Sequence, residues 1–410
     1  MPLLQVCDLS VSFAPTQAHH APLHALRHCS LQVESGQMVG VIGESGCGKT
    51  TLNHVLEGML PYSHGQVLLN SKELRSLLPH AGQGSATATT SKAAPLQRKL
   101  RSLLPQWLRP QPPQEPPQHS APSENTALLQ ARPYYALVQS IPQDPRAASA
   151  GCSLERLALA PLLNFQHYST THARKVIKAE LAAMDLPEDM LSRAPTEVSN
   201  GQLQRLFILK SLAIKPQLLL CDEITSALDP HSAQLCLERL RHEVTSSGLS
   251  VLYITHDLGL ALQYCDVIYV MFKGTVIERF VPQARLRQKP PQHSTAGTAH
   301  VTAPVPVVHH PYTQQLRQAQ LTMAGALSLD QWQAPQALSC PRSSDELCPF
   351  VLRCSLGTEV CLQQKPPCQK LSAEQMVFCH LPPAQLALAA AALEQSKAQA
   401  EAAADGKTVT

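Results

Sequence analysis

The sequence predicts an α/β fold built around buried strands. Three short, predominantly apolar runs, each about the length of a strand, are Met38–Ile42, Leu218–Cys221 and Val251–Thr255. A strand that is apolar on both faces is typical of the middle of a sheet covered by helices. The first run leads into a glycine-rich segment and then into a predicted helix over Thr51–Met59, which is the strand–loop–helix order of an α/β unit.

The remaining elements follow from the same signals in chain order. Further strands are predicted where apolar residues recur between turn residues, at Leu4–Phe13, Ser30–Val33, Gly65–Leu69, Val267–Met271 and Thr275–Ile277. A helical arm is predicted over residues 154–195, within which Leu154–Arg193 has a helical pattern. The strands near the N-terminus predict an antiparallel part beside the α/β core.

Composition restricts the class of protein. A chain of 410 residues exceeds one typical domain, and a net charge of +3 does not favour nucleic acid as a partner. The cysteines are not spaced as a secreted disulfide framework, which predicts a reducing compartment. The N-terminus lacks the pattern of a secretory signal, and no run approaches the roughly 20 apolar residues that span a bilayer. We therefore expect a cytosolic protein whose membrane role, if any, comes through a partner.

A proline-rich stretch interrupts the first domain. This domain is predicted over residues 1–280, and within it residues 71–133 hold ten prolines with many Gln and Ser. Such a composition buries too little apolar surface to offset the entropy of ordering, so we expect a disordered insertion with order resuming at Tyr134. The alternative interpretation of Pro110–Pro117 is a docking site for a proline-binding module.

Three segments follow the first domain. Residues 281–308 are predicted to be a polar linker, and residues 309–382 form a cysteine-containing extension. Residues 383–410 form an alanine-rich tail, in which Ala384–Ala404 is expected to be a frayed, solvated helix.

The glycine-rich segment after Met38–Ile42 has the pattern of a phosphate-binding loop. It fits G-x-x-x-x-G-K-[ST] between a strand and a helix, the context that the motif requires. In such a loop backbone N–H groups point at the β- and γ-phosphates of ATP, the lysine adds a positive charge and the hydroxyl coordinates Mg²⁺. The predicted ATP-binding residues here are Gly43, Glu44, Ser45, Gly46, Cys47, Gly48, Lys49, Thr50 and Thr51.

A second candidate site follows the apolar run Leu218–Cys221. Asp222 and Glu223 place two carboxylates at the end of a buried strand. We expect Asp222 to hold the Mg²⁺ shell and Glu223 to act as the general base for the attacking water, with Lys49 as a further catalytic group. The alternative, a strand end capped by solvated acids, is disfavoured by the phosphate loop earlier in the chain.

The segment between these motifs carries a family resemblance. Val198-Ser199-Asn200-Gly201-Gln202 resembles the LSGGQ signature of ATP-binding cassette proteins, in which a helix N-terminus grips the γ-phosphate bound by the opposite subunit. The resemblance implies that Ser199, Gly201 and Gln202 contact nucleotide. Val198 and Asn200 depart from the pattern. A Cβ at position 200 would crowd the phosphate and slow the site, although Asn tolerates unusual φ values.

Other positions match the same family. Ser226–Asp229 resembles the D-loop, and His256 resembles the switch histidine that contacts the γ-phosphate and Glu223. Gln143 resembles the Q-loop glutamine, which senses Mg²⁺ and faces the transmembrane partner. Phe13 is placed like the aromatic residue that stacks on adenine; alternatively it is a core residue of its strand.

The C-terminal part resembles one branch of the family. His310-Pro311-Tyr312-Thr313 resembles the HPYT motif of peptide and nickel importers. The cysteine spacing C-x₅-C-x₆-C-x₁₇-C resembles the extension of oligopeptide and dipeptide importer ATPases, and the loop motifs are most similar to the F-type subunit. The ligands implied for a [4Fe–4S] cluster are Cys348, Cys354, Cys361 and Cys379. Zn²⁺ or no metal are the alternatives, and the additional Cys340 and Cys368 leave the ligand choice open.

The resemblance implies a RecA-like core and an ATPase that energises an importer of peptides or related small solutes. It implies a head-to-tail pair of cassette subunits, transmembrane permease subunits and, indirectly, a solute-binding protein, with the chain peripheral on the cytoplasmic face of the inner membrane. Ile224, where the family has proline, and Asn200 indicate a divergent member. The rival interpretations are a soluble non-transport cassette ATPase and a regulatory subunit with one degenerate ATP site.

Overall fold

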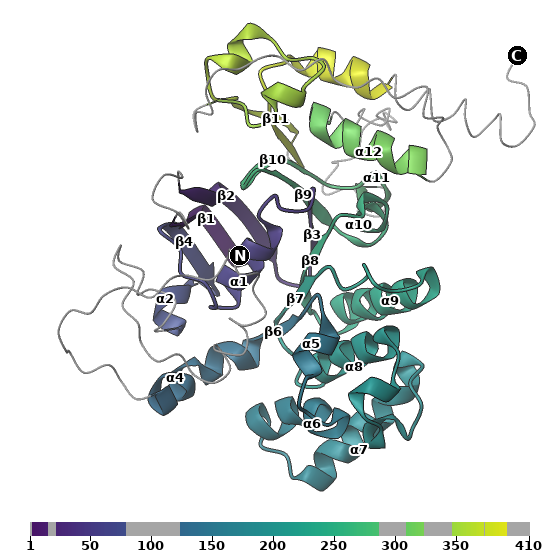
Figure 1. Cartoon of the computed structure of the whole chain (residues 1–410). Coiled ribbons are helices and arrows are strands. Elements are labelled where there is room, and N and C mark those ends of the chain that lie inside the picture. The colour runs from purple at the N-terminus through teal and green to yellow at the C-terminus, as the bar shows by residue number, and fades with distance from the viewer. Residues whose placement is uncertain are drawn as a thin grey trace, which may run out of the picture. The chain divides into compact units, whose positions relative to one another are not determined.

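The computed structural model describes residues 2–14, 22–78, 124–286, 309–323, 347–372 and 374–391. The chain divides into two compact units, and Figure 1 draws the whole chain with its helices and strands labelled. The first unit contains Met1–Val41, Ser45–His256 and Lys273–Thr275, and the second contains Ile42–Glu44, Asp257–Phe272 and Val276–Thr410.

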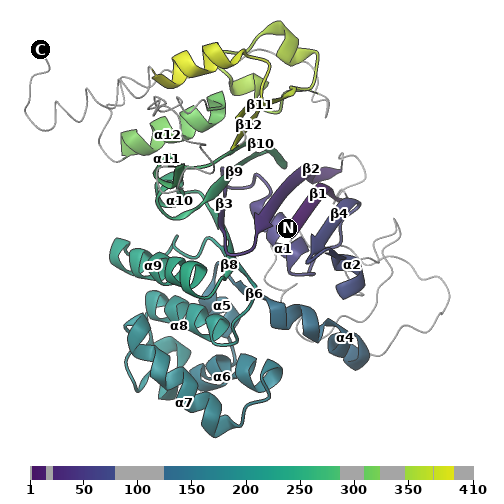
Figure 2. The same ribbon diagram turned by 180° about the vertical axis from the view of Figure 1, so that it is seen from behind.

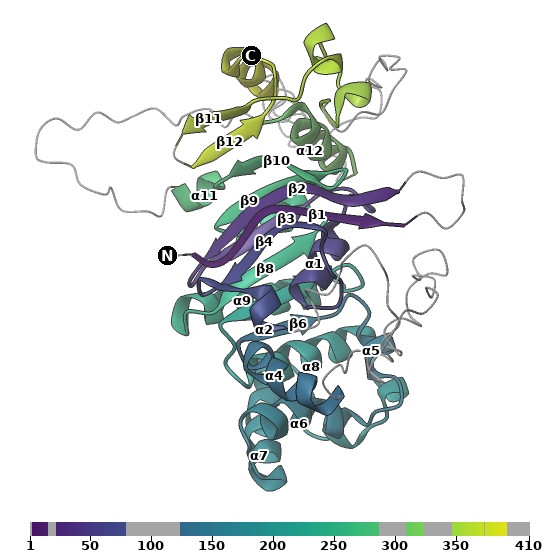
Figure 3. The ribbon, with the colours of Figure 1, turned by 90° about the vertical axis from the view of Figure 1, so that its left-hand side faces the viewer.

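An antiparallel sheet forms one part of the first unit (Figure 3). Its strands lie in the order β2-β1-β4-β5, with bounds Leu23–Glu34, Pro2–Phe13, His64–Leu69 and Lys72–Glu73. Val6 pairs with Leu31 on one side and with Val67 on the other, and all three are buried. The prediction over Ser30–Val33 found only the end of β2. The strand begins earlier, at Leu23, in a half-exposed stretch whose polar residues weaken the apolar signal.

The second sheet of this unit contains the buried strands expected from the sequence. Its strands lie in the order β3-β8-β7-β6, with bounds Met38–Ile42, Ser250–Thr255, Leu218–Asp222 and Val138–Ile141. Every residue of β3, β7 and β8 is buried, and β7 is parallel to both β6 and β8. Parallel strands end at the same edge of a sheet, so the residues that follow β6, β7 and β8 are brought together there.

Helices complete the first unit (Figures 1 and 2). Their bounds are α1 Lys49–Leu56, α5 Pro145–Ser149, α6 Leu154–Phe165, α7 Thr170–Leu181, α8 Asn200–Leu212 and α9 Pro230–Ser246. The region Leu154–Arg193, predicted as helical, contains two helices, α6 and α7, followed by 3₁₀ turns. His167 adopts a positive φ, and the Ser169 hydroxyl accepts the His172 N–H as the N-cap of a new helix. Three short 3₁₀ turns, η2 Ala182–Met184, η3 Met190–Ser192 and η4 Pro195–Glu197, lead to α8.

Both ends of the predicted insertion are ordered. The short helix α2, Leu74–Leu77, follows β5, and α4 spans Glu124–Leu137, so order resumes before Tyr134. Leu78 is buried against Gly58, where an added Cβ would stand 2.4 Å from the Leu78 side chain. A few apolar anchors of this kind hold segments that composition alone assigns to disorder. Residues 79–123, which include Pro110–Pro117, lie outside the described part.

A four-stranded arrangement organises the second unit. Its strands lie in the order β11-β12-β10-β9, with bounds Cys368–Ser372, Gln375–Phe378, Thr275–Phe280 and Val267–Phe272. Its helices are α10 Leu258–Tyr264, α11 Gln283–Leu286 and α12 Pro311–Met323, with the 3₁₀ turns η6 Val351–Arg353 and η7 Glu359–Leu362. Strand β12 is antiparallel to β10, so the C-terminal extension joins this sheet.

A buried carboxylate anchors the extension to β10. Glu278 is fully buried, and its oxygens accept hydrogen bonds from His309 Nδ1 at 2.8 Å, the His310 N–H at 3.1 Å and the Thr313 hydroxyl. The Gln375 amide lies 3.4 Å from the same carboxylate. A buried charge with this many donors is fully satisfied, so the segment around the HPYT motif is tied to the sheet.

The alanine-rich tail begins as a packed helix. Residues 383–391 are helical, and Leu386 is fully buried in a cluster with Val377, Cys379 and Leu381. This helix lies beside α12, where the Gln314 amide donates to the Leu386 carbonyl at 3.4 Å (Figure 2). Leu386 is the one buried residue among 383–391, so these turns pack through a single side chain and are otherwise partly or fully exposed. The rest of the tail lies outside the described part. Within the ranges that the structure describes, no helix is long and apolar enough to cross a membrane.

Candidate nucleotide-hydrolysis site

The phosphate loop is shaped by its glycines. Gly46 and Gly48 both have positive φ, and a Cβ added at Gly48 would lie 2.5 Å from the Ala25 carbonyl oxygen. No side chain fits there, which explains the glycine physically. Gly48 is also the N-cap of α1 and has no side chain to cover the N–H groups of the first turn. A helix start of this form is suited to an anion.

Lys49 and Thr50 begin α1 and face the end of β7. Lys49 is 4% exposed, and its Nζ lies 3.9 Å from Glu223 Oε1 and 4.0 Å from Cys47 Sγ. The Thr50 side chain forms a hydrogen bond with Asp222. The two motifs that are far apart in the sequence, the phosphate loop and the Asp-Glu pair, are thus adjacent. Thr51 lies half-buried on the same helix.

Asp222 has the properties of a cation ligand. It is 3% exposed, and its Oδ1 has no hydrogen-bond partner among the described residues. Burial raises its pKa to about 6, and the charge of Glu223 adds to this, while Thr50 and Lys49 oppose it. A buried carboxylate oxygen that lacks a donor fits Mg²⁺, which binds through carboxylate and hydroxyl oxygens and water.

Glu223 is surrounded by three predicted site residues. The Gln143 amide donates to Oε2 at 3.0 Å, while Lys49 Nζ and His256 Nδ1 lie 3.9 and 3.6 Å from Oε1. Glu223 has a φ of 48°, and its N–H donates to the Ile254 carbonyl at 2.9 Å. A non-glycine residue in this conformation is strained, and such strain concentrates at functional sites. The carboxylate is therefore held in a defined place at the carboxyl edge of the sheet.

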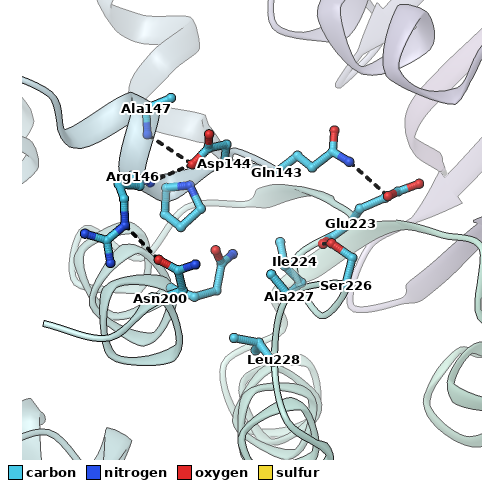
Figure 4. Close-up of a pocket in the computed structure, with 12 residues that line it drawn as sticks. Gln143, Asp144, Arg146, Ala147, Asn200, Glu223, Ile224, Ser226, Ala227 and Leu228 are labelled. Carbon is cyan, nitrogen blue, oxygen red and sulfur yellow. Dashed lines mark hydrogen bonds between the residues drawn. The ribbon is translucent and has the colours of Figure 1, made fainter.

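A pocket opens beside this carboxylate (Figure 4). Its volume is about 560 Å³, and residues from the Q-loop, the signature helix and the D-loop line it. The lining residues are Gln143, Asp144, Pro145, Arg146, Ala147, Asn200, Gln204, Glu223, Ile224, Ser226, Ala227 and Leu228.

The signature segment forms the capped start of α8. The Ser199 hydroxyl accepts the Gln202 N–H at 3.1 Å, and the Gln202 side chain accepts the Ser199 N–H at 3.0 Å, which is a capping box. A Cβ added at Gly201 would find its nearest neighbours at 3.6 Å, an ordinary contact distance. Contacts within the chain therefore do not require glycine at this position.

Asn200 is held by an arginine that sequence analysis did not single out. Arg146 Nε donates to Asn200 Oδ1 at 2.8 Å, and its other nitrogens donate to the Pro195 and Val198 carbonyls at 3.1 and 2.9 Å. The Asp144 side chain caps α5 and accepts the Arg146 N–H (Figure 4). This hydrogen bond fixes the backbone position from which the arginine side chain extends. No motif marks Arg146. The available signal is a polar residue, Asn200, placed where the family pattern has glycine.

Glu57 is a second residue that the sequence analysis missed. It is 8% exposed on the turn after α1, where the Asn53 amide donates to it at 3.0 Å and the Ser140 hydroxyl also donates. Burial raises its pKa to about 7; Asp222 contributes to the rise, and the two hydrogen bonds oppose it. The signal is a charged residue on the buried face of a short helix.

Three predicted residues are not brought into this cluster. Phe13 is the last residue of β1, pairs with Leu23 and is half-buried. This position does not distinguish stacking on adenine from a role in the core of its strand. Gly43 and Glu44 belong to the second unit.

The four predicted metal-ligating cysteines are buried close to one another. Their exposed fractions lie between 5 and 8%, for Cys348, Cys354, Cys361 and Cys379. Burial raises the pKa of Cys348 to about 12 and that of Cys354 to about 11, and neighbouring thiols add to both shifts. In the part of the chain that the structure describes, no group of three or more His, Cys, Asp or Glu has the arrangement of a metal site. The donor chemistry fits a thiolate-bound metal, whereas the positions of these side chains do not form its cage.

Known proteins share this fold and sequence. The sequence pattern described as "ABC transporter" matches residues 26–226. The oligopeptide transport ATP-binding protein OppF of Haemophilus influenzae is 26% identical over 380 residues, covering 91% of this chain and 92% of that protein. The probable D,D-dipeptide transport ATP-binding protein DdpD of Escherichia coli is 30% identical over 285 residues, covering 68% and 71%.

A solved structure has the same fold. The dimeric, post-hydrolysis structure of an ATP-binding cassette bound to ADP and phosphate gives a TM-score of 0.50 at 19% identity, covering 68% of this chain and 99% of that one. This likeness shows the fold alone. Together with the sequence matches, it establishes that the chain belongs to the family of ABC transporter ATP-binding proteins, as a divergent member with the cassette fold of P-loop ATPases.

Proposed function

We propose that this chain is the ATP-hydrolysing subunit that energises a membrane importer of peptides or related small solutes. The observation that carries the proposal is the cluster around Glu223, in which Gln143, Lys49 and His256 surround one carboxylate beside the unpartnered Asp222 oxygen. The peptide class is supported by relatives whose names specify oligopeptide and D,D-dipeptide transport.

In the proposed reaction each residue has one task. The loop residues Ser45–Thr50 bind the phosphates of ATP through backbone N–H groups, and Lys49 neutralises charge on the β- and γ-phosphates. Asp222 and Thr50 would hold Mg²⁺, which supplies further neutralisation of the developing charge. Glu223 accepts a proton from the attacking water while the water oxygen forms a bond to the γ-phosphorus. The bond between the γ-phosphorus and the ADP oxygen breaks, which gives ADP and phosphate. His256 orients the same carboxylate.

A second cassette subunit would complete each site. Ser199, Gly201 and Gln202 are proposed to contact the γ-phosphate held by the opposite subunit's loop. The open space at Gly201 supports this, because none of the residues that the structure describes requires glycine there and an approaching phosphate would. Gln143, bonded to Glu223 on an exposed loop, is placed to transmit contact with a permease subunit to the carboxylate.

The cysteine segment is proposed to hold one metal centre, a [4Fe–4S] cluster or alternatively Zn²⁺. The support is that Cys348, Cys354, Cys361 and Cys379 are all buried in this short extension. Metal binding would require these thiols as thiolates. The centre would fasten an extension that is too short to hold a large core of its own.

The proposed location is the cytoplasmic face of the inner membrane, with attachment through permease subunits and delivery of solute by a binding protein. A regulatory subunit with one degenerate site is the second candidate, favoured only by Asn200. The Glu223 cluster and the buried Lys49 argue against it, because a silent site does not need an oriented base.

Uptake in proteoliposomes tests the proposal. The full chain, assembled with its permease and partner cassette, is supplied with a labelled mixture of di- and tripeptides. ATP-dependent uptake should be lost in Lys49→Ala and retained in Lys175→Ala, a matched control at an exposed lysine of α7. ATP hydrolysis without a membrane partner and without peptide uptake would instead support a soluble non-transport ATPase.

A further inference from the structure

Glu44, the second residue of the phosphate loop, forms hydrogen bonds with the C-terminal extension. Its backbone N–H donates to the Tyr312 hydroxyl oxygen at 2.9 Å. Its two carboxylate oxygens accept hydrogen bonds from Nη1 and Nη2 of Arg353 at 2.8 and 2.7 Å. The contacts come from two segments of the extension, α12 and η6, and all three residues lie in the second unit.

The geometry of Arg353 distinguishes this pair from an ordinary surface ion pair. Each of the two terminal guanidinium nitrogens donates to a different carboxylate oxygen, a paired arrangement that lysine cannot reproduce. Glu44 raises the pKa of the Arg353 guanidinium above its usual value through the hydrogen bond and the opposite charge. The guanidinium carbon also lies 5.6 and 5.8 Å from the ring centroids of Phe272 and Phe350.

An aromatic cluster holds Tyr312 in place. Its ring centroid lies 4.7 Å from that of Phe272 and 5.3 Å from that of Phe350, and Phe350 lies 5.7 Å from His310. Tyr312 is 1% exposed and Phe350 is 1% exposed. The hydroxyl therefore cannot move far from the Glu44 N–H without repacking buried rings.

We propose that Tyr312 and Arg353 are positioning residues of the phosphate loop, through which the C-terminal extension sets the affinity for ATP. The loop binds phosphate with backbone N–H groups, so its affinity depends on how well the backbone is ordered before ATP arrives. Fixing Glu44 by its N–H and by its carboxylate orders one end of the loop. The inference rests on the proposed function, since it concerns the same ATP site.

A second set of contacts, independent of Glu44, ties the extension to β10 and makes the inference testable. The buried Glu278 network with His309, His310 and Thr313 does not involve Glu44. Substitutions at Arg353 or Tyr312 therefore test positioning of the loop rather than loss of the extension.

The experiment measures the dissociation constant for MgATP in the purified full chain by titration calorimetry. Arg353→Ala, Glu44→Gln and Tyr312→Phe are each expected to raise it about two- to fivefold, the range for a hydrogen-bonded pair that is partly exposed. Arg353→Lys should fall between wild type and Arg353→Ala, because it keeps the charge and loses the fork. Arg285→Ala is the matched control, since this arginine pairs with Asp266 in the same unit.

The double variant Arg353→Ala/Glu44→Gln decides the outcome. Positioning through one shared contact predicts that the double variant has a dissociation constant no higher than that of either single variant. Single variants that bind as tightly as wild type, effects that add in the double variant, or an equal effect from Arg285→Ala would overturn the inference. Failure of the proposed function is distinguishable, because the proteoliposomes would then show no ATP-dependent peptide uptake while the wild-type chain still bound MgATP.

Discussion

Arg146 Nε donates a hydrogen bond to Asn200 Oδ1 at 2.8 Å and so ties the helix after the Q-loop to the first residue of the signature helix. Two further bonds from the same guanidinium reach the Pro195 and Val198 carbonyls. The Asn200 side chain thus has a partner within the chain. The position read from sequence as a defect has a structural role in this protein.

This contact reverses the expected effect of restoring glycine. Crowding of the opposite phosphate predicts that Asn200→Gly speeds ATP hydrolysis, whereas loss of the Arg146 bond predicts a slower rate. We expect Asn200→Gly and Arg146→Ala each to lower the rate of the assembled complex about two- to tenfold, which corresponds to one hydrogen bond. The double variant should be no slower than Arg146→Ala. A faster Asn200→Gly enzyme would contradict this account.

Gly201 tests whether a partner's phosphate approaches α8. Because an added Cβ meets its nearest neighbours at 3.6 Å, Gly201→Ala should leave the melting temperature of the isolated chain within about a degree of wild type. Hydrolysis by the assembled complex should fall at least about tenfold, since the methyl group would stand between the helix start and the phosphate. Normal hydrolysis in a stable variant would argue against the shared site.

The buried carboxylate of Asp222 should make the free energy of unfolding depend on pH. Its pKa rises from 3.8 to about 6 on folding, so ionisation destabilises the folded state, and this penalty grows between about pH 4 and pH 6 and is complete above it. Without Mg²⁺ or nucleotide, Asp222→Asn should stabilise the chain by about 2–3 kcal/mol at pH 7.5 and by much less at pH 5. Thermal unfolding at both pH values measures this.

The control for this prediction is Asp229→Asn. The Ser232 N–H lowers the pKa of Asp229, so neutralising this group should not stabilise the chain at pH 7.5. Equal stabilisation by both variants, or none from Asp222→Asn, would show that Asp222 is not held as an unpaired buried charge.

The parts of the fold predicted from sequence are those with strong local signals. The apolar runs of β3, β7 and β8 indicate buried strands, because runs of this length between turn residues are typical of strands and too short for most helices. The helical pattern over Leu154–Arg193 does not show where α6 ends and α7 begins, because a polar cap such as Ser169 in an amphipathic stretch resembles its exposed face.

The candidate site likewise contains residues that the sequence predicts and residues that only the tertiary structure reveals. Gly48, Lys49 and Glu223 carry motifs, so the sequence predicts them. Arg146 and Arg353 act through long side chains that reach segments 54 and 309 residues away in the sequence, and no local pattern encodes such a contact. Tertiary structure is required to find them.

The cysteine segment predicts a metal whose loss leaves the ATP site intact. Anaerobically purified protein should be brown with about four iron and four sulfide per chain for a cluster, or colourless with about one Zn²⁺ for the alternative. Cys354→Ser should release the metal, while Cys368→Ser, at an exposed cysteine, should retain it. Protein with neither metal, in which all four buried thiols react with an alkylating reagent, would leave the extension unliganded.

The central claim is that Glu223 is the base that activates water, and Glu223→Gln tests it most directly. The amide keeps the size of the side chain and removes the proton acceptor, while ATP binding depends on the phosphate loop. Phosphate release by the assembled complex should fall about 10²- to 10⁴-fold with MgATP affinity within about threefold of wild type, and Glu238→Gln on the exposed face of α9 should leave both unchanged. Near-normal phosphate release by Glu223→Gln would contradict the account.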